Sequence, residues 1–260
     1  MKHLISLLAF SFLIGCDGEK SNKSPFEGLL GKADSETKPT EAVSVENPNL
    51  KYVIEGDAIT ITSCDKKASG HLIIPATIKG KTVTTISYAF LRCTSLTNIT
   101  IPEGVTSIGA GAFQFCTSLT SITIPDTVTS IGIGAFLRCS SLTSITIPDG
   151  VTSIGNSAFH FCTSLKNITI PDSVTSIGIG AFLRCTSLTS ITIPDGVTSI
   201  GNQAFGYCTS LTAVTFLGDA PKIENDAFKQ SSPNIYREAK AKGWGDTLAG
   251  RPVKLISEKP

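Results

Sequence analysis

The chain has 260 residues, a length that suits one large domain or two small ones. Only 17% of the residues are charged and the formal net charge is +1, so nothing in the composition favours nucleic acid or an anionic membrane as a partner. Isoleucine, threonine, serine and glycine recur along the chain, as suits β-strands joined by tight turns.

The N-terminus has the pattern of an export signal. A basic start at Met1 to His3 precedes an apolar run from Leu4 to Ile14. As a helix this run would be about 16 Å long, too short for the ~30 Å hydrocarbon core of a membrane. A basic head, a short apolar run and a small residue before a break are typical of a cleaved signal peptide, which we place at residues 1–15.

The residues at this break, Leu13-Ile14-Gly15-Cys16, resemble a bacterial lipobox. The resemblance implies cleavage before Cys16, diacylation of its thiol, and anchoring of the exported protein to a bacterial membrane, in the periplasm or at the cell surface. The alternative is a chance cysteine after a plain signal peptide. The anchor would be the chain's only contact with the membrane.

Two segments separate the signal from the rest of the chain. Residues 16–50 are rich in Ser, Glu, Lys, Asn and Pro, and they predict a flexible tether because they cannot bury enough apolar surface to offset their ordering entropy. Residues 51–71 predict a β-hairpin with its turn at Glu55-Gly56-Asp57. We expect this hairpin to cap the N-terminal end of the following domain.

Residues 72–233 consist of repeats. The dipeptide Ala-Phe, a cysteine three residues after its phenylalanine, and Ile-Pro all recur every 23 residues. Self-similarity at such a period predicts a solenoid of about seven turns, in which stacked turns bury each other's apolar side chains. The phenylalanines of the series are Phe90, Phe113, Phe136, Phe159, Phe182, Phe205 and Phe228.

One unit, from Leu119 to Ser141, shows the expected path of a turn. Leu119, Ile122 and Ile124 predict a strand of a parallel sheet, which Pro125 ends because proline cannot donate to the ladder. A second short extended piece follows, and Gly132 lets the chain turn. The last inward-facing residues of the unit, with spacing that suits one helical turn, are Ala135, Phe136 and Cys139.

The unit reads Ser-Leu-x-x-Ile-x-Ile-Pro-x-x-Val-x-x-Ile-Gly-x-x-Ala-Phe-x-x-Cys, and this pattern resembles the BspA-type bacterial leucine-rich repeat. The resemblance covers about residues 51–256 and implies a mainly β solenoid. It also implies a surface or secreted protein, as family members are, and some members of the family take part in adhesion. The ninth position departs from the general leucine-rich repeat, since glycine, threonine or serine stands where asparagine or cysteine is expected.

Residues 234–260 predict a C-terminal cap, since solenoid ends expose apolar cross-sections. We expect a short helix over Ile235 to Lys242, closed by Gly243. Trp244 and a strand from Val253 to Ile256 follow it.

The strand face that points away from the core is the candidate binding surface for a protein or a glycan, because solenoids commonly bind partners there. Its side chains are small, neutral and hydroxylated. The alternative is a solvated face whose threonines pair between turns. The candidate residues are Thr100, Ser121, Thr123, Ser144, Thr146, Asn167, Thr169, Ser190 and Thr192.

Two further positions form columns when the turns stack. The cysteines from Cys93 to Cys208 predict buried free thiols, because stacked side chains point the same way and suit a disulfide poorly. Cys64 lies outside this period. A second column is acidic, and we expect its carboxylates to bond the local turn, with a ladder of divalent cations as the alternative; it consists of Glu103, Asp126, Asp149, Asp172 and Asp195.

The residue before each cysteine alternates between arginine and an aromatic residue, so its period is 46 residues. We expect the arginines and rings to stack alternately, with recent duplication of a two-turn block as the other explanation. The members of this column, named the arginine–aromatic ladder below, are Arg92, Phe115, Arg138, Phe161, Arg184 and Tyr207.

No motif in the sequence indicates catalysis, a cofactor or a metal site. After signal removal only His71 and His160 remain, almost four repeats apart, and nucleophile-elbow, zinc-protease and phosphate-loop motifs are missing. The sequence therefore predicts a lipid-anchored binding module of the cell envelope, adhesin-like rather than enzymatic. The alternative is a passive structural envelope protein without a specific ligand.

Overall fold

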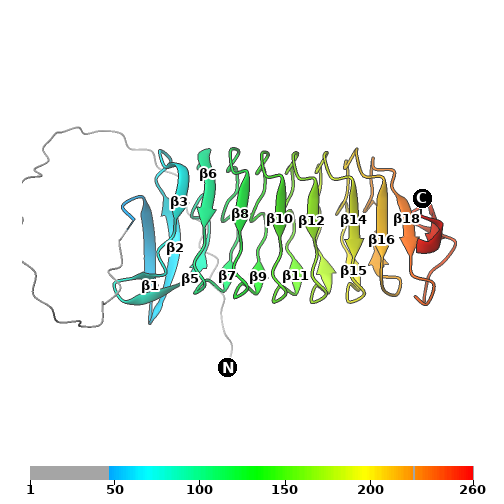
Figure 1. Ribbon diagram of the computed structural model, residues 1–260, viewed down its shortest axis with the longest axis horizontal. Helices are drawn as coiled ribbons and strands as arrows, with labels where there is room; N and C mark the ends of the chain where they lie inside the picture. The colour runs from blue at the N-terminus through cyan, green and yellow to red at the C-terminus, as the bar shows by residue number, and fades with distance from the viewer. Residues whose placement is uncertain (1–46, 225, 260) are drawn as a thin grey trace, which may run out of the picture. The chain divides into compact units, whose positions relative to one another are not determined.

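The computed structural model describes residues 47–224 and 226–259, which form a β-solenoid of about eight stacked turns (Figure 1). The fold class predicted from the repeat is confirmed, with one turn more than expected. Within these two ranges no helix is long and apolar enough to cross a membrane. The signal peptide, Cys16 and most of the predicted tether lie outside the described residues.

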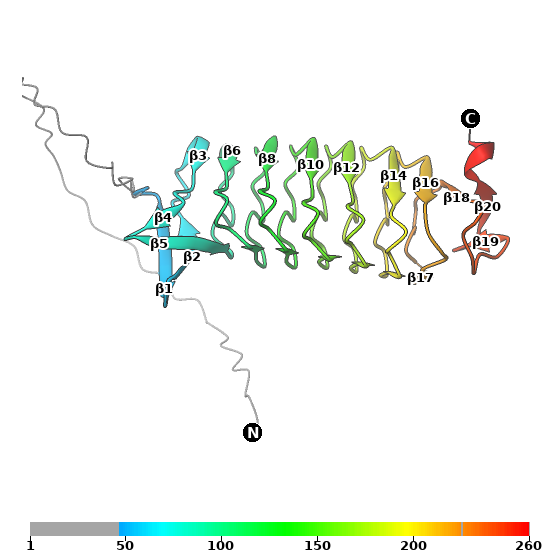
Figure 2. The same ribbon diagram turned by 60° about the horizontal axis from the view of Figure 1, so that its bottom comes forward.

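Each repeat contributes a strand to one row that faces solvent, here called the binding-face row. The row consists of three sheets, β3 to β8, β10 to β12 and β14 onward, and the paired strands of neighbouring repeats lie parallel and in register. Figure 2 shows this row at the top of the view. Its strands are β3 (Ser69–Ile73), β6 (Ser95–Thr100), β8 (Ser121–Thr123), β10 (Ser144–Thr146), β12 (Asn167–Thr169), β14 (Ser190–Ile193), β16 (Ala213–Phe216), β18 (Asn234–Arg237) and β20 (Arg251–Leu255).

A second row of short strands runs along the other side of the turns and joins the N-terminal strands in one continuous sheet. This row is the second extended piece that the sequence predicts. Its strands are β7 (Ser107–Ile108), β9 (Ser130–Ile131), β11 (Ser153–Ile154), β13 (Ser176–Ile177), β15 (Ser199–Ile200) and β17 (Lys222–Ile223), after β1 (Leu50–Glu55), β2 (Ala58–Cys64), β4 (Thr77–Ile78) and β5 (Lys81–Ile86).

The core is a repeat of the same side chains in every turn. Along β8, Ile122 is buried while Ser121 and Thr123 are exposed, as the two-residue period of a strand requires. The seven phenylalanines of the Ala-Phe pairs, from Phe90 to Phe228, are buried, and neighbouring rings stack with centroids 5.2–5.5 Å apart. This phenylalanine stack runs through the whole row of turns.

The predicted helical turn at Ala-Phe-x-x-Cys is wrong. The amide of Phe136 donates to Ala158 O of the next turn at 2.8 Å, whereas a helix would use it along its own chain. The amide of Cys139 donates to Phe136 O at 3.1 Å, which closes a β-turn, and Arg138 between them has a φ of 60°. Alternate amides therefore serve neighbouring turns, and the backbone cannot wind into a helix.

The N-terminal cap is a hairpin of β1 and β2, which pair antiparallel, and β2 then pairs parallel with β5. The hairpin turn is fixed to the start of β5, because Lys81 Nζ donates to Gly56 O at 2.6 Å and to Asp57 Oδ1 at 2.9 Å. This arrangement pairs β2 on both sides at the end of the continuous sheet.

The C-terminal cap differs from the prediction at Ile235 to Lys242, where the expected helix is wrong. Ile235 and Tyr236 are buried in β18, which continues the sheet because it pairs in register with β16. The expected last strand forms as β20, which pairs with β18 and with β19 (Thr247–Leu248), and a single 3-10 turn η1 (Ile256–Glu258) follows it. Trp244 packs edge-on against Phe216, with ring centroids 5.0 Å apart.

Candidate binding surface

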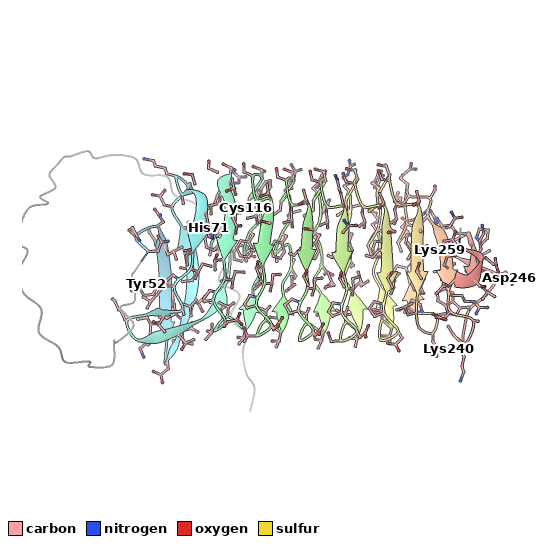
Figure 3. All side chains as sticks on the ribbon, in the orientation of Figure 1. Tyr52, His71, Cys116, Lys240, Asp246 and Lys259 are labelled. Carbon is pink, nitrogen blue, oxygen red and sulfur yellow. The ribbon has the colours of Figure 1, made fainter. Side chains whose placement is uncertain are left out.

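The structure brings all nine residues of the predicted binding surface to one face, and all nine side chains are exposed. In-register pairing of neighbouring strands places them in two columns. One column is Ser121, Ser144, Asn167 and Ser190, and the other is Thr100, Thr123, Thr146, Thr169 and Thr192. Figure 3 shows these strands with their side chains, and His71 marks the N-terminal end of the row.

Most of these polar groups are available to a partner. Thr100 Oγ1 lies 2.8 Å from His71 Nε2, and Ser121 Oγ accepts a hydrogen bond from Asn98 at 3.4 Å. The other seven side chains make no hydrogen bond to another described residue. These hydroxyl and amide groups can bind a partner through hydrogen bonds, because their donors and acceptors are not used inside the protein.

The alternative expectation, that threonines pair between turns, holds for the neighbouring column instead. The hydroxyl of Thr120 donates to Thr97 O at 3.1 Å, and that of Thr143 donates to Thr120 O at 3.4 Å. These threonines therefore support the stacking of the turns. The candidate residues do not share this role.

A depression of about 420 Å³ lies across the binding-face row between β12 and β14. The row is interrupted there, since β12 ends a two-stranded sheet and β14 begins a five-stranded one. Ile168 is half-buried at this interruption, while the corresponding Ile145 and Ile191 are buried. The lining includes four candidate residues, namely Asn167, Thr169, Ser190 and Thr192.

Leu217, Asp172 and Pro194 also line the depression, and the sequence analysis does not name them as binding residues. Leu217 stands where the earlier repeats have proline. This departure from the repeat was thus a signal in the sequence that this end of the face differs from the rest.

The acidic column is exposed, and its expected bonding to the local turn is wrong. The turn that follows each proline is closed by a hydrogen bond between backbone groups. For example, Val128 N donates to Pro125 O at 3.0 Å. Within the described residues, none of the five carboxylates accepts the kind of amide hydrogen bond that Asp65 accepts from Lys67 N at 2.9 Å. Across residues 47–224 and 226–259, no three His, Cys, Asp or Glu groups are placed to hold a metal ion, so the cation ladder has no ligand cluster.

The arginine–aromatic ladder is confirmed. Arg138 lies over both neighbouring rings, with its guanidinium carbon 5.4 Å from the centroid of Phe115 and 4.5 Å from that of Phe161. Arg184 likewise lies 5.2 Å from Phe161 and 4.8 Å from Tyr207. His160 stacks on Phe161 at 4.6 Å, and burial together with the charges of Arg138 and Arg184 lowers the pKa of this imidazole.

The periodic cysteines are buried and free, as predicted. Five thiols each donate to the carbonyl of a phenylalanine 26 residues earlier, at 3.1–3.2 Å, from Cys116 with Phe90 to Cys208 with Phe182. Burial raises the pKa of Cys162 to about 12. These thiols are therefore packing groups with little thiolate character.

Comparison with known proteins supports the assignment of the repeat. The chain matches the family described as "BspA type Leucine rich repeat region (6 copies)" over residues 73–185 and 106–236. A search of curated proteins found no match.

Among solved structures, a leucine-rich repeat protein of T. pallidum (TpLRR) is 32% identical with a TM-score of 0.61, covering 65% of this chain and 84% of that one. A leucine-rich cell surface protein of Faecalibacterium prausnitzii is 34% identical (TM-score 0.52, 68% and 55% covered), and the pneumococcal vaccine antigen PcpA is 27% identical (TM-score 0.52, 66% and 49%). The chain thus spans only about half of the latter two proteins. The repeat pattern, the stacked turns and these matches together show that the chain belongs to the BspA-type leucine-rich repeat family.

Proposed function

We propose that the protein is a lipid-anchored binding module of the bacterial cell envelope, which binds a protein or glycan partner through the binding-face row. The observation that carries the proposal is the set of exposed candidate side chains without internal hydrogen bonds, four of which line one depression. Unused hydroxyl and amide groups around a partly apolar hollow are what a polar ligand requires.

The location at the cell surface is supported by two independent features. The lipobox around Cys16 follows an export signal in the sequence, and the similar protein of F. prausnitzii is described as a cell surface protein. PcpA, which is described as a vaccine antigen, has the same fold over 66% of this chain. A lipid-anchored module of this kind would present its solenoid to the outside of the membrane.

A passive structural role is the second candidate function. The nine candidate residues include no tryptophan or arginine, the residue types that dominate the strongest contacts of most protein interfaces. A spacer without a ligand would need only the stacked turns and the anchor.

Binding to a panel of matrix proteins and glycans tests the proposal with the mature protein. For each ligand captured, the triple variant Thr146→Lys, Thr169→Lys and Thr192→Lys should lose at least 90% of the bound signal, about a tenfold effect that corresponds to ~1.4 kcal/mol. The matched control carries Thr152→Lys, Thr175→Lys and Thr198→Lys, which are exposed directly before β11, β13 and β15 on the other side of the turns, and it should bind as the wild type does. A mature protein that captures nothing from the panel would support the passive role.

The anchor is tested separately by metabolic labelling with a palmitate analogue. The wild-type protein should carry the label and fractionate with membranes. Cys16→Ala should be unlabelled, because no other thiol follows an export signal. A soluble, unlabelled wild-type protein would disprove the anchor without affecting the binding test.

A further inference from the structure

Two thiols meet at the N-terminal end of the cysteine column. Cys64 ends β2 of the cap hairpin, and Cys93 is the first cysteine of the repeats. The sulfur atom of Cys64 lies 3.5 Å and that of Cys93 lies 3.9 Å from the same carbonyl oxygen, that of Asp65. The pair therefore joins the cap to the first repeat.

The rest of the column lacks this arrangement. Each cysteine from Cys116 onward donates its thiol to the phenylalanine carbonyl of the preceding turn. Cys93 has no such carbonyl, because the residue 26 positions earlier is Lys67, in the loop after β2, and not the phenylalanine of an Ala-Phe turn. At the other end of the column Ser231 replaces cysteine and donates to Phe205 O at 2.7 Å. Among the described residues, Cys93 is therefore the one cysteine of the column that lies beside a thiol from outside the repeats.

The charges around the pair favour one thiolate. Lys66 Nζ lies 3.9 Å from Cys93 Sγ, so its ammonium group stabilises negative charge on that sulfur. The neighbouring Cys64 thiol and the charge of Lys66 lower the pKa of Cys93, whereas the Cys93 thiol and burial raise the pKa of Cys64. Burial instead raises the pKa of Cys116 and of Cys208 to about 12. Cys93 is thus the nucleophilic thiol of the column.

We propose that Cys64 and Cys93 form a disulfide that fastens the N-terminal hairpin to the first repeat after export. This inference needs only the export included in the proposed function, and it is independent of what the binding-face row binds. Cys64 comes from the hairpin and not from the repeat register, so the parallel side-chain directions that prevent disulfides between successive column cysteines do not apply to this pair.

The chemistry is thiol–disulfide exchange with a disulfide donor, such as glutathione disulfide or a thiol oxidase of the envelope. The Cys93 thiolate attacks one donor sulfur and releases a donor thiolate, which leaves a mixed disulfide on Cys93. The Cys64 thiol then gives up its proton and attacks the Cys93 sulfur, which releases the second donor thiolate. The protein loses two electrons and two protons, and the donor disulfide is reduced to two thiols.

Both side chains are buried in the folded protein, so the donor must reach them while the hairpin is open. The bond would then close the loop from Cys64 to Cys93 and keep the end of the solenoid from opening. Solenoid ends contact only one neighbouring turn, so a covalent link there restricts the least stable part of the stack.

Peptide mapping of the full chain carrying Cys16→Ser tests the disulfide. The protein is refolded with glutathione disulfide, alkylated without reduction, digested and analysed by mass spectrometry. We expect one linked peptide pair, Cys64 with Cys93, lighter by two hydrogen atoms than the two free peptides. The five cysteines from Cys116 to Cys208 should be alkylated only after unfolding. Seven alkylated cysteines, or a link between two column cysteines, would overturn the proposal.

Thermal unfolding with and without dithiothreitol gives a second readout. Reduction should lower the melting temperature of the oxidised protein by roughly 5–10 °C, and it should not change that of Cys64→Ser. Cys208→Ser is the matched control, because serine already occupies the equivalent place at Ser231, and it should keep the full shift on reduction. Equal melting temperatures of the oxidised and reduced wild type would contradict the role of the bond as a fastening. If Cys64→Ser does not fold, the peptide map of the Cys16→Ser protein still decides.

Discussion

Each turn of the solenoid carries two stacks on opposite sides of one backbone segment. Phe136 points inward, and its ring centroid lies 5.2 Å and 5.3 Å from those of the two neighbouring phenylalanines. Arg138, two residues later, points outward, and its guanidinium carbon lies 5.4 Å and 4.5 Å from the centroids of two neighbouring rings. The spacing between turns is the same for both stacks. The inner stack repeats one residue every 23 positions, whereas the outer one alternates every 46.

The difference shows what burial demands of a repeat. An inner position has a fixed volume in every turn, so phenylalanine recurs seven times without exception. The outer position is limited only by its contacts with the rings above and below. Like charges in successive turns are tolerated on the surface, since the acidic column from Glu103 to Asp195 has them. The alternation of arginine with rings therefore adds contacts, and avoidance of repulsion does not explain it.

Removing one ring of the inner stack should reduce the free energy of unfolding more than any other change proposed here. Phe159→Ala deletes a buried ring that stacks on two neighbours, at 5.3 Å and 5.4 Å, and leaves a cavity in the middle of the stack. We expect a loss of about 3–5 kcal/mol in the free energy of unfolding, measured in urea. Phe161→Ala in the outer ladder serves as the matched control and should cost less than half as much. Equal losses would remove the distinction between the two stacks.

The second largest loss of stability should come from a substitution at a glycine where the backbones of two successive turns lie close together. A Cβ at Gly155 would lie 2.7 Å from the carbonyl carbon of Gly132, which is backbone and cannot move aside. Gly155→Ala should cost roughly 1–3 kcal/mol in urea unfolding.

Gly150→Ser is the control for this substitution. Ser173 occupies the equivalent position in the next turn, where its hydroxyl donates to Val151 O at 2.7 Å. The free energy of unfolding should therefore change by less than about 0.5 kcal/mol. A costly Gly150→Ser would show that the turns differ more than their sequences indicate.

The outer ladder should contribute a smaller, measurable coupling. A double-mutant cycle of Arg138→Leu and Phe161→Ala isolates the contact between the guanidinium and the ring from the area that each substitution removes. We expect a coupling of about 0.5–1 kcal/mol in the free energy of unfolding. A coupling of zero would leave duplication of a two-turn block as the explanation of the 46-residue period.

The smallest effect concerns pH. The pKa of His160 lies below its ordinary value in the folded chain, so near and below pH 6.5 the unfolded chain binds more protons there. Stability should therefore fall as the pH drops through about 6.5 and level off once the folded imidazole is also protonated.

Thermal unfolding of His160→Gln provides the comparison, since Gln114 stands at the equivalent position. Between about pH 7.5 and about pH 5 the wild type should lose more stability than this variant. Identical pH profiles would show that the neighbouring arginines do not act on the imidazole.

The sequence alone determined the period, the inward or outward side of the repeated positions, and the columns that stacking creates. A strand alternates its faces every two residues, and identical turns place identical positions above one another. The phenylalanine stack, the buried thiols, the exposed binding-face row and the arginine–aromatic ladder all follow from these two rules.

The tertiary structure decided what depends on contacts between turns and at the ends. The Ala-Phe-x-x-Cys segment has the spacing of a helix, but its alternate amides donate to the next turn, so it forms β-turns. Ile235 has helix-compatible neighbours, yet it extends the sheet because β16 offers an unpaired edge. The depression between β12 and β14 and the meeting of Cys64 with Cys93 likewise join residues 23 or more positions apart. Local pattern does not encode such contacts, since their partners are fixed only when the turns stack.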